Sequence, residues 1–478
     1  MPDTTTFIPD LLYVGGRFRR GHALVCDAEG RVAAVARVEE LTGESQTVRL
    51  RGRALLPGMV NAHSHAFQRV IRGRTEFRGA AAADSFWTWR EMMYAAAARL
   101  TPEDIYDASR MAFMEMTLAG ITSVGEFHYL HRTPEGGAYD DPNLLALEVV
   151  RAARDVGLRI ALLRVAYARA GYLKEPDPRQ LRFVEPDFET FLRNTDALAR
   201  HLEGEPGAWL GIAPHSVRAV PTKYLRGLRA YAYMYHLPLH MHVAEQPAEV
   251  EACLAEHGRT PVVLLADEGV LSPRFTGVHA VHVTPEEIEL LRAAKACVCA
   301  CPTTERNLGD GVVPADAFMN AGVRVALGTD SHTQIDLLED ARELEYHLRL
   351  TTLRRNVLAP AGVEDESRRE GTPEVAALAA RLFECATVAG AESIGAHAGS
   401  FEPGRAADFF TVDLEDPSVA GAGAEDLLPA IVFSLARAAV RETAVGGRLV
   451  VESGRHLAQH DIVSRFASLQ KRLWGSEE

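Results

Sequence analysis

The chain contains few cysteines and no long apolar run, and each scarcity excludes a class of protein. Six scattered cysteines in 478 residues are not the pattern of a disulfide framework, so reduced thiols are expected. No stretch of about 18 apolar residues is free of charge, and no basic start precedes an apolar stretch. We therefore expect no membrane span, no secretory signal and a cytoplasmic location.

Positive charge is also in deficit. The 51 lysines and arginines are outnumbered by 65 aspartates and glutamates, which gives a net charge of −14. This balance argues against a nucleic-acid binder and provides no long-range attraction for an anionic ligand. Any anion must be held by local arginines, because lysine occurs only at Lys174, Lys223, Lys295 and Lys471.

Histidines, in contrast, stand at the ends of apolar runs. The run Leu55–Val60 leads into Asn61-Ala62-His63-Ser64-His65. Residues i and i+2 of a strand point to the same side, so His63 and His65 can reach one ion at the carboxyl end of a strand. Seen alone, such a tripeptide is more often a pair of polar residues in a turn.

Three later apolar runs change that balance, because each also ends in side chains that can bind a metal. Imidazole and carboxylate suit a divalent ion of the zinc type. Three or four such ligands with an open position describe a catalytic site rather than a structural one, so a hydrolytic metal site is the leading interpretation. The residues at these run ends are His240, His242 and Glu245, then His279 and His282, then Asp330.

The order of elements favours an α/β protein. Strand-like runs alternate with helical stretches from about residue 57 to 395, which favours a (β/α)8 barrel of the TIM type over a doubly wound open sheet. Both chain ends are rich in strands, so a small β-sandwich-like domain built from both termini is expected. We predict this domain over residues 1–57 and 398–478, with a closing helix near its end, and the barrel over residues 58–397. Residues Gly79–Ala83 are expected to form a flexible turn.

The order of motifs resembles that of the amidohydrolase superfamily across essentially the whole chain. The shared motifs are Pro57-Gly58-Met59-Val60-Asn61 before the paired histidines, single histidines on later strands, Gly328-Thr329-Asp330, and Pro403-Gly404-Arg405-Ala406-Ala407-Asp408. Longer strings are similar to the formimidoylglutamate deiminase (N-formimino-L-glutamate iminohydrolase) family of histidine degradation. These strings are Asn61–Arg69, Asp84–Glu91, Glu126–Tyr129, Ala213–Val220 and Asn307–Gly311.

The resemblance implies a role for each matching residue. One zinc ion would be bound by His63, His65, His242 and Asp330. The catalytic groups beside the water that the metal activates would be Glu245, His279 and Asp330. The substrate would be contacted by Gln68, Arg90, Tyr129, His215 and Arg218.

The implied reaction is the hydrolysis of N-formimino-L-glutamate to N-formyl-L-glutamate and ammonia. This small dicarboxylate suits the two arginines, since a guanidinium group binds a carboxylate in a bidentate manner. Two-metal members of the superfamily typically use a carboxylated lysine on a middle strand. Lys174 lies in an expected loop and Lys223 at an expected helix start, so we predict a single metal ion. Relatives are commonly homodimers, and a homodimer is expected here.

Other functions remain open at this stage. A deaminase acting on an aminopurine, aminopyrimidine or triazine ring would share the metal residues but would not obviously need two arginines. A catalytically silent scaffold is less expected, because such relatives typically lose metal ligands. A zinc carrier would leave Glu245 without a purpose.

Several further histidines and cysteines accompany the motifs. We expect His240 and His282 to stay off the metal, and we expect His128, His131 and His332 to line the pocket or to orient ligands. The alternation in Cys297-Val298-Cys299-Ala300-Cys301 predicts a buried strand with small apolar thiols rather than a thiolate metal site.

Overall fold

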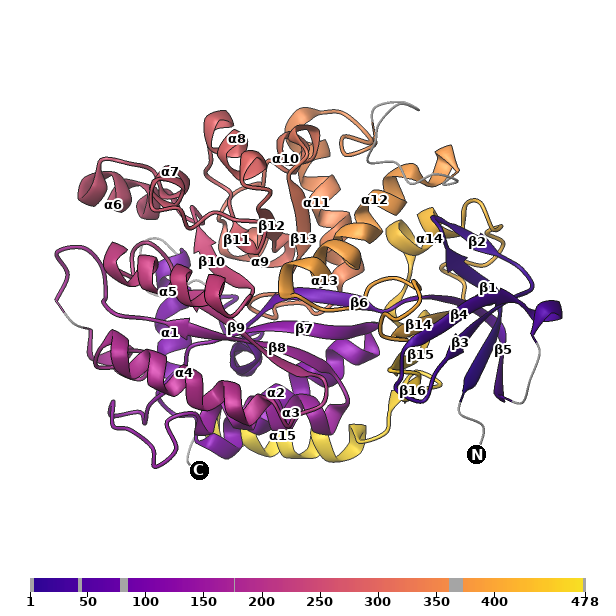
Figure 1. Ribbon diagram of the computed structural model, residues 1–478, viewed down its shortest axis with the longest axis horizontal. Coiled ribbons are helices and arrows are strands. Elements are labelled where there is room, and N and C mark those ends of the chain that lie inside the picture. Colours follow the sequence, from indigo (N-terminus) through magenta and orange to yellow (C-terminus); the bar gives the residue numbers. More distant parts are fainter. Residues whose placement is uncertain (1–3, 42–44, 78–84, 176, 361–372, 476–478) are drawn as a thin grey trace.

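The computed structural model describes residues 4–41, 45–77, 85–175, 177–360 and 373–475. In Figure 1 a barrel wrapped by helices lies beside a smaller sheet that contains strands from both ends of the chain. The flexible turn expected at Gly79–Ala83 falls outside the described residues. No helix in the described part of the chain is both long and apolar enough to cross a membrane.

The barrel is a sheet of eight parallel strands that follow each other in chain order. Every residue of β6, β7 and β11 is buried, which is typical of strands covered on both faces. The strands are β6 (Met59–Ser64), β7 (Ile121–His128), β8 (Arg159–Ala166), β9 (Ala208–Pro214), β10 (Leu239–Val243), β11 (Phe275–His279), β12 (Cys297–Ala300) and β13 (Arg324–Leu327).

The first and last strands close the barrel. Ser64 forms a parallel bridge with Asp330. The Asp330 N–H donates to the His63 carbonyl at 3.0 Å, and the His65 N–H donates to the Asp330 carbonyl at 3.1 Å. The predicted TIM-type barrel is therefore confirmed, and closure brings the two ends of the metal motif together.

Helices follow the strands and cover the barrel in Figure 1. Local sequence sets their starts; Thr101, for example, forms a capping box with Asp104 at the start of the helix that begins with Pro102. The helices of the barrel region are α1 (Phe86–Ala97), α2 (Pro102–Leu118), α3 (Leu144–Val156), α4 (Phe188–Leu202), α5 (Thr222–Met234), α6 (Pro247–His257), α7 (Pro261–Asp267), α8 (Pro285–Ala293), α9 (Pro302–Leu308), α10 (Ala315–Ala321), α11 (Leu337–Thr352), α12 (Ala377–Cys385) and α13 (Val388–Ile394), with short 3-10 turns η2 (Ala66–Ile71), η3 (Pro178–Gln180) and η4 (Glu374–Ala376).

The second sheet is mixed and joins both ends of the chain. Its central strand β5 pairs in parallel with β1 and antiparallel with β14, so N-terminal and C-terminal strands share one sheet of nine. This confirms the expected β domain from both termini. Its strands are β1 (Thr5–Val14), β2 (Arg17–Arg19), β3 (His22–Cys26), β4 (Val32–Arg37), β5 (Gln46–Pro57), β14 (Phe409–Asp413), β15 (Val440–Val445), β16 (Arg448–Glu452) and β17 (Arg455–His456), with turns η1 (Val38–Glu40) and η5 (Arg437–Ala439) and helix α14 (Leu427–Ser434).

The last helix, α15 (Gln459–Trp474), returns from this sheet to the barrel and lies along α2 (Figure 1). Arg110 of α2 forms an ion pair with Asp461 at 2.8 Å. All six cysteines are buried and free. Cys297 and Cys299 lie on strand β12 as the alternation predicted, whereas Cys301 lies just beyond the strand, at the N-cap of α9.

Candidate active site

The candidate residues lie at the rim formed by the carboxyl ends of the barrel strands. His63 is on β6, His242 is on β10 and His279 is the last residue of β11. Asp330 comes three residues after β13. The carboxyl ends of parallel strands meet at one rim, which is why segments far apart in sequence share a site in barrels of this kind.

Four buried side chains converge on one point of this rim. The Nε2 atom of His63 lies 3.2 Å from Nε2 of His65 and 3.2 Å from Nε2 of His242. Asp330 Oδ1 lies 3.2 Å from Nε2 of both His63 and His65. Zinc–ligand bonds of about 2.0–2.1 Å in tetrahedral geometry place ligand atoms about 3.3 Å apart, so the cluster has the dimensions of a zinc site.

The imidazole tautomers also fit a metal ion. Nδ1 of His65 donates to the Phe127 carbonyl and Nδ1 of His242 donates to the His215 carbonyl, each at 3.0 Å. The Nε2 lone pairs of these two rings therefore face the cluster, where a cation between them removes their mutual repulsion. Nδ1 of His63 is buried without a partner among the described residues.

Electrostatics keep these ligands in their metal-binding form. Burial lowers the pKa of His63 to about 3 and holds the pKa of His242 well below its ordinary value. Burial alone would raise the pKa of Asp330, but its hydrogen bonds with His63 and His65 hold that pKa well below the usual range. Neutral imidazoles and an ionised carboxylate are the forms that metal binding requires.

The close approach of β13 to β6 constrains the backbone between Gly328 and Asp330. A Cβ at Gly328 would lie 2.8 Å from Cβ of His63, so only glycine fits there. The Asn61 amide donates to Thr329 Oγ1 at 2.7 Å, and its oxygen accepts from the Thr329 N–H at 3.0 Å. Asp330 then adopts a left-handed φ of 43°, an unfavourable conformation that concentrates at functional sites.

Glu245 and His279 lie beside the cluster. His279 Nε2 is 3.8 Å from Glu245 Oε1 and 3.9 Å from Asp330 Oδ2. On the other side of the ring, Nδ1 is 3.1 Å from Oε1 of Glu305, which also accepts from the Cys301 N–H at 2.8 Å. Burial raises the pKa of Glu245. Burial alone would lower the pKa of His279, but the nearby carboxylates raise it well above its ordinary value.

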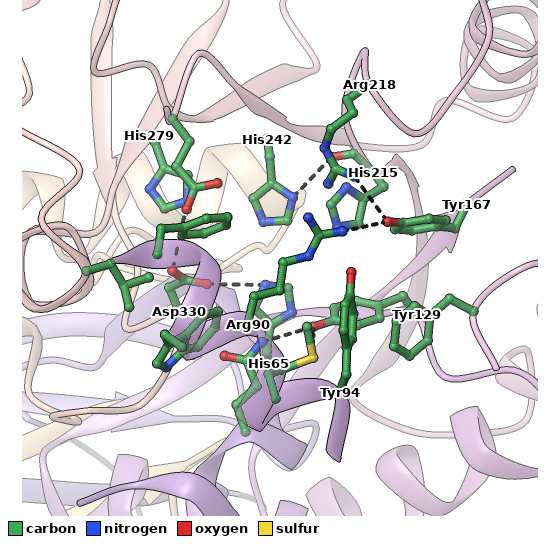
Figure 2. A pocket seen from close by; sticks show the side chains of 17 residues that line it. His65, Arg90, Tyr94, Tyr129, Tyr167, His215, Arg218, His242, His279 and Asp330 are labelled. Carbon is green, nitrogen blue, oxygen red and sulfur yellow. Dashed lines mark hydrogen bonds and ion pairs between the residues drawn. The ribbon is translucent and has the colours of Figure 1, made fainter. Parts of the chain in front are cut away.

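A pocket opens onto the cluster and is shown in Figure 2. His65, His242 and Asp330 form its floor on the metal side, and Glu245 and His279 line it as well. The structure also brings to this pocket every residue predicted to contact substrate: Gln68, Arg90, Tyr129, His215 and Arg218.

These pocket residues are held by one another. The Gln68 amide donates to the Tyr129 hydroxyl at 2.9 Å. Arg90 and Arg218 each donate to the Tyr167 hydroxyl at 3.3 Å. The pocket therefore combines a metal-sized cluster with two guanidinium groups that can bind anions.

Comparison with known proteins identifies the family of the chain. The profile of the amidohydrolase family matches residues 54–450. The chain belongs to the amidohydrolase family. The sequence-based expectation of the superfamily is thereby confirmed, and so is the expectation of a hydrolytic enzyme that acts on C–N bonds.

Three relatives illustrate the range of this amidohydrolase's neighbours. It is 38% identical to formimidoylglutamate deiminase of Pseudomonas aeruginosa over 423 residues, which are 88% of this chain and 90% of that protein. It is 28% identical to 5-methylthioadenosine/S-adenosylhomocysteine deaminase of Natronomonas pharaonis over 430 residues, which are 89% of this chain and 88% of that protein. A crystal structure of an amidohydrolase from Brucella melitensis superposes with a TM-score of 0.88 at 33% identity and covers 98% of this chain and 99% of its own.

The other five histidines that accompany the sequence motifs lie outside the four-residue cluster. Nε2 of His240 bonds the Ser393 carbonyl and Nε2 of His282 bonds the Asp310 carbonyl, each at 2.8 Å. His332 lies behind the cluster, where Nε2 is 3.0 Å from Ser64 Oγ. Nε2 of His131 bonds the Val165 carbonyl at 2.8 Å. The His128 ring packs against the His131 ring, with centroids 5.8 Å apart.

Sequence reasoning missed three residues of the amidohydrolase site, namely Tyr94, Tyr167 and Glu305. Tyr167 directly follows β8 just as Tyr129 directly follows β7, so its place at a strand end was a usable signal. Tyr94 lies one helical turn beyond Arg90 on α1, a spacing that puts both on one face. No sequence pattern indicated Glu305, because its partner His279 lies on another element.

Proposed function

We propose that this amidohydrolase is a zinc-dependent formimidoylglutamate deiminase. It would convert N-formimino-L-glutamate and water to N-formyl-L-glutamate and ammonia, a step of histidine degradation. The observation that carries the proposal is that Arg90 and Arg218 reach into the same pocket as the metal cluster. A substrate with two carboxylates and one hydrolysable imino carbon matches that combination.

Two half-buried guanidinium groups in one pocket favour anionic ligands. Arg90 and Arg218 are half-buried, and in Figure 2 their guanidinium groups point into the pocket from different sides. Charge-assisted bonds from arginine to carboxylate are about twice as strong as neutral ones. In a chain of net charge −14, these local groups supply the attraction that the molecule as a whole lacks.

The zinc ion would be held by His63, His65, His242 and Asp330, and when bound it lowers the pKa of water towards 7, which supplies a nucleophile at neutral pH. Asp330 Oδ2 is placed to take the proton that the water loses, and His279 is placed to orient the water and to stabilise negative charge. Glu245, whose pKa is raised by burial, is placed to give a proton to the imino nitrogen. Ammonia then leaves and a formyl group remains on the glutamate nitrogen.

A ring deaminase is the second candidate, because a relative at 28% identity bears the name of an adenosine-type deaminase. 5-Methylthioadenosine has no anionic group and S-adenosylhomocysteine has one carboxylate, so neither gives both guanidinium groups an anionic partner. The pocket therefore favours a dicarboxylate over a nucleoside.

The test is ammonia release by purified, zinc-loaded protein. N-formimino-L-glutamate, an aminopurine nucleoside and an aminopyrimidine are compared at equal concentration. We expect rapid release from the dicarboxylate alone. Release from a ring substrate alone would leave the metal site in place and overturn the proposed substrate.

The single zinc ion, the cytoplasmic location and the homodimer stay predictions. A single ion is supported by the fold, since Lys174 lies in a loop and Lys223 lies on α5, outside the barrel sheet.

A further inference from the structure

Tyr167 joins the two arginines of the pocket through one oxygen atom. Its hydroxyl accepts from Nη2 of Arg90 and from Nη1 of Arg218, each at 3.3 Å. Arg90 comes from α1, whereas Arg218 comes from the loop after β9, so the shared hydroxyl links guanidinium groups from two separate elements (Figure 2).

The tyrosine is held rigidly. It is buried, it directly follows β8, and its ring packs edge-on against His215 with centroids 4.7 Å apart. The arginines have second supports. Arg218 also donates to the Ala170 carbonyl at 3.2 Å, and the Arg90 guanidinium lies over the Tyr94 ring at 5.0 Å.

The bridging Tyr167 hydroxyl offsets the repulsion between the two guanidinium groups. Two guanidinium cations this close to a common atom repel each other, and a flexible arginine side chain would move away if nothing opposed the repulsion. A shared acceptor oxygen keeps both cations near one point, and each retains further N–H groups for a ligand. The burial of Tyr167 raises its own pKa, but the two arginines outweigh burial and lower it.

We propose that Tyr167 is a specificity-determining residue that fixes the separation of the Arg90 and Arg218 guanidinium groups and thereby the length of the dicarboxylate that the pocket accepts. This inference rests on the proposed function in that it takes the ligand to be a dicarboxylate. Tyr167 acts through the arginines and is a positioning residue. Because the spacing is fixed, a dicarboxylate with three carbons between its carboxylates, as in glutamate, binds better than shorter or longer ones.

The first test uses the wild-type zinc-loaded enzyme and measures the binding of succinate, glutarate and adipate by calorimetry, with butyrate as the monocarboxylate comparison. We expect glutarate to bind at least about tenfold more tightly than the other three. Equal affinity for the three dicarboxylates, or for glutarate and butyrate, overturns the proposal without any variant.

The second test is Tyr167→Phe, which removes the bridging oxygen and keeps the ring. The control is Tyr231→Phe, which also removes a hydrogen-bonded tyrosine hydroxyl: Tyr231 on α5, outside the pocket, donates to Asp196 at 2.6 Å. We expect the glutarate-to-succinate preference to fall at least fivefold in Tyr167→Phe only. On formiminoglutamate, KM rises tenfold or more while kcat changes less than threefold. An unchanged preference in a folded Tyr167→Phe protein contradicts the inference.

Failure of this inference is separable from failure of the proposed function. If the enzyme releases no ammonia from formiminoglutamate but Tyr167→Phe abolishes a glutarate preference, the spacing role of Tyr167 stands and the deiminase function is rejected. If the enzyme turns over formiminoglutamate but Tyr167→Phe leaves the glutarate preference unaltered, the deiminase function stands and the spacing role is rejected.

Discussion

Single residues of the metal cluster are oriented by what lies behind them. The His65 and His242 rings face the cluster with Nε2 because backbone carbonyls accept from their Nδ1 atoms. His279 is held in the same manner by the Glu305 carboxylate. Such outer partners fix the tautomer of a histidine and so decide which nitrogen can act.

Glu245→Gln tests the assigned acid. Glutamine keeps the shape of the side chain but cannot give up a proton, so kcat should fall by about 10²–10⁴ while one zinc per chain is retained. Steady-state kinetics and metal analysis of the same preparation check this. Glu251→Gln on the exposed side of α6 is the matched control and should behave as wild type. Near-normal kcat in Glu245→Gln removes it from the mechanism.

Glu305→Gln tests the positioning of His279. The amide weakens the hold on Nδ1, so kcat should fall by about 10–100-fold with little change in KM. The control is Glu343→Gln, because Glu343 forms a comparable pair with His347 at 2.8 Å on α11. A titration of kcat against pH gives a second readout, since loss of the carboxylate should lower the pKa of His279. An unmoved pH profile together with full activity shows that Glu305 has no such role.

Secondary-structure elements determine which side chains meet. The ligands on β6 and β10 could be predicted, because alternation along a strand places residues i and i+2 on one side and each run ends at the same rim. The joint contact of Arg90 and Arg218 with Tyr167 could not be derived from spacing. It depends on how α1 and the loop after β9 fold over the rim, and loop geometry carries no periodic signal.

Gly328→Ala tests the closure of β13 on β6. The added Cβ would lie 2.8 Å from the His63 Cβ and 3.0 Å from its backbone N and O, so the strands must separate. We expect a loss of stability of about 1–3 kcal/mol and weaker zinc binding. Denaturant unfolding and competition with a zinc chelator measure the two effects.

The control for this change is Gly277→Ala on β11 of the same barrel. Its Cβ would meet no neighbour closer than 3.5 Å, from Phe275, which is ordinary packing. If both variants bind zinc equally well, the close approach at Gly328 does not shape the metal site.

The whole molecule combines a barrel that holds the site with a sheet that ties both ends of the chain together. This arrangement could be predicted, because β-rich segments at both ends flank alternating strands and helices. That the small domain's nine strands form one mixed sheet could not, since the pairing of β5 with both β1 and β14 joins segments more than 350 residues apart.

Removal of the metal should lower the stability of the whole fold. A ligand that binds only the folded chain stabilises it by RT ln(1 + [L]/Kd), about 4 kcal/mol at a free concentration one thousand times Kd. Dialysis against a chelator should therefore lower the midpoint of thermal unfolding, and one equivalent of zinc should restore it. A continued rise up to two equivalents would contradict the single-ion prediction.

The most direct test of the deiminase is to identify both products. Zinc-loaded enzyme is incubated with N-formimino-L-glutamate, and the products are quantified by NMR and an ammonia assay. Hydrolysis at the imino nitrogen predicts one N-formyl-L-glutamate for each ammonia. Formamide and glutamate in equal amounts would mean that the other C–N bond is cleaved, and no turnover at all would contradict the proposed substrate.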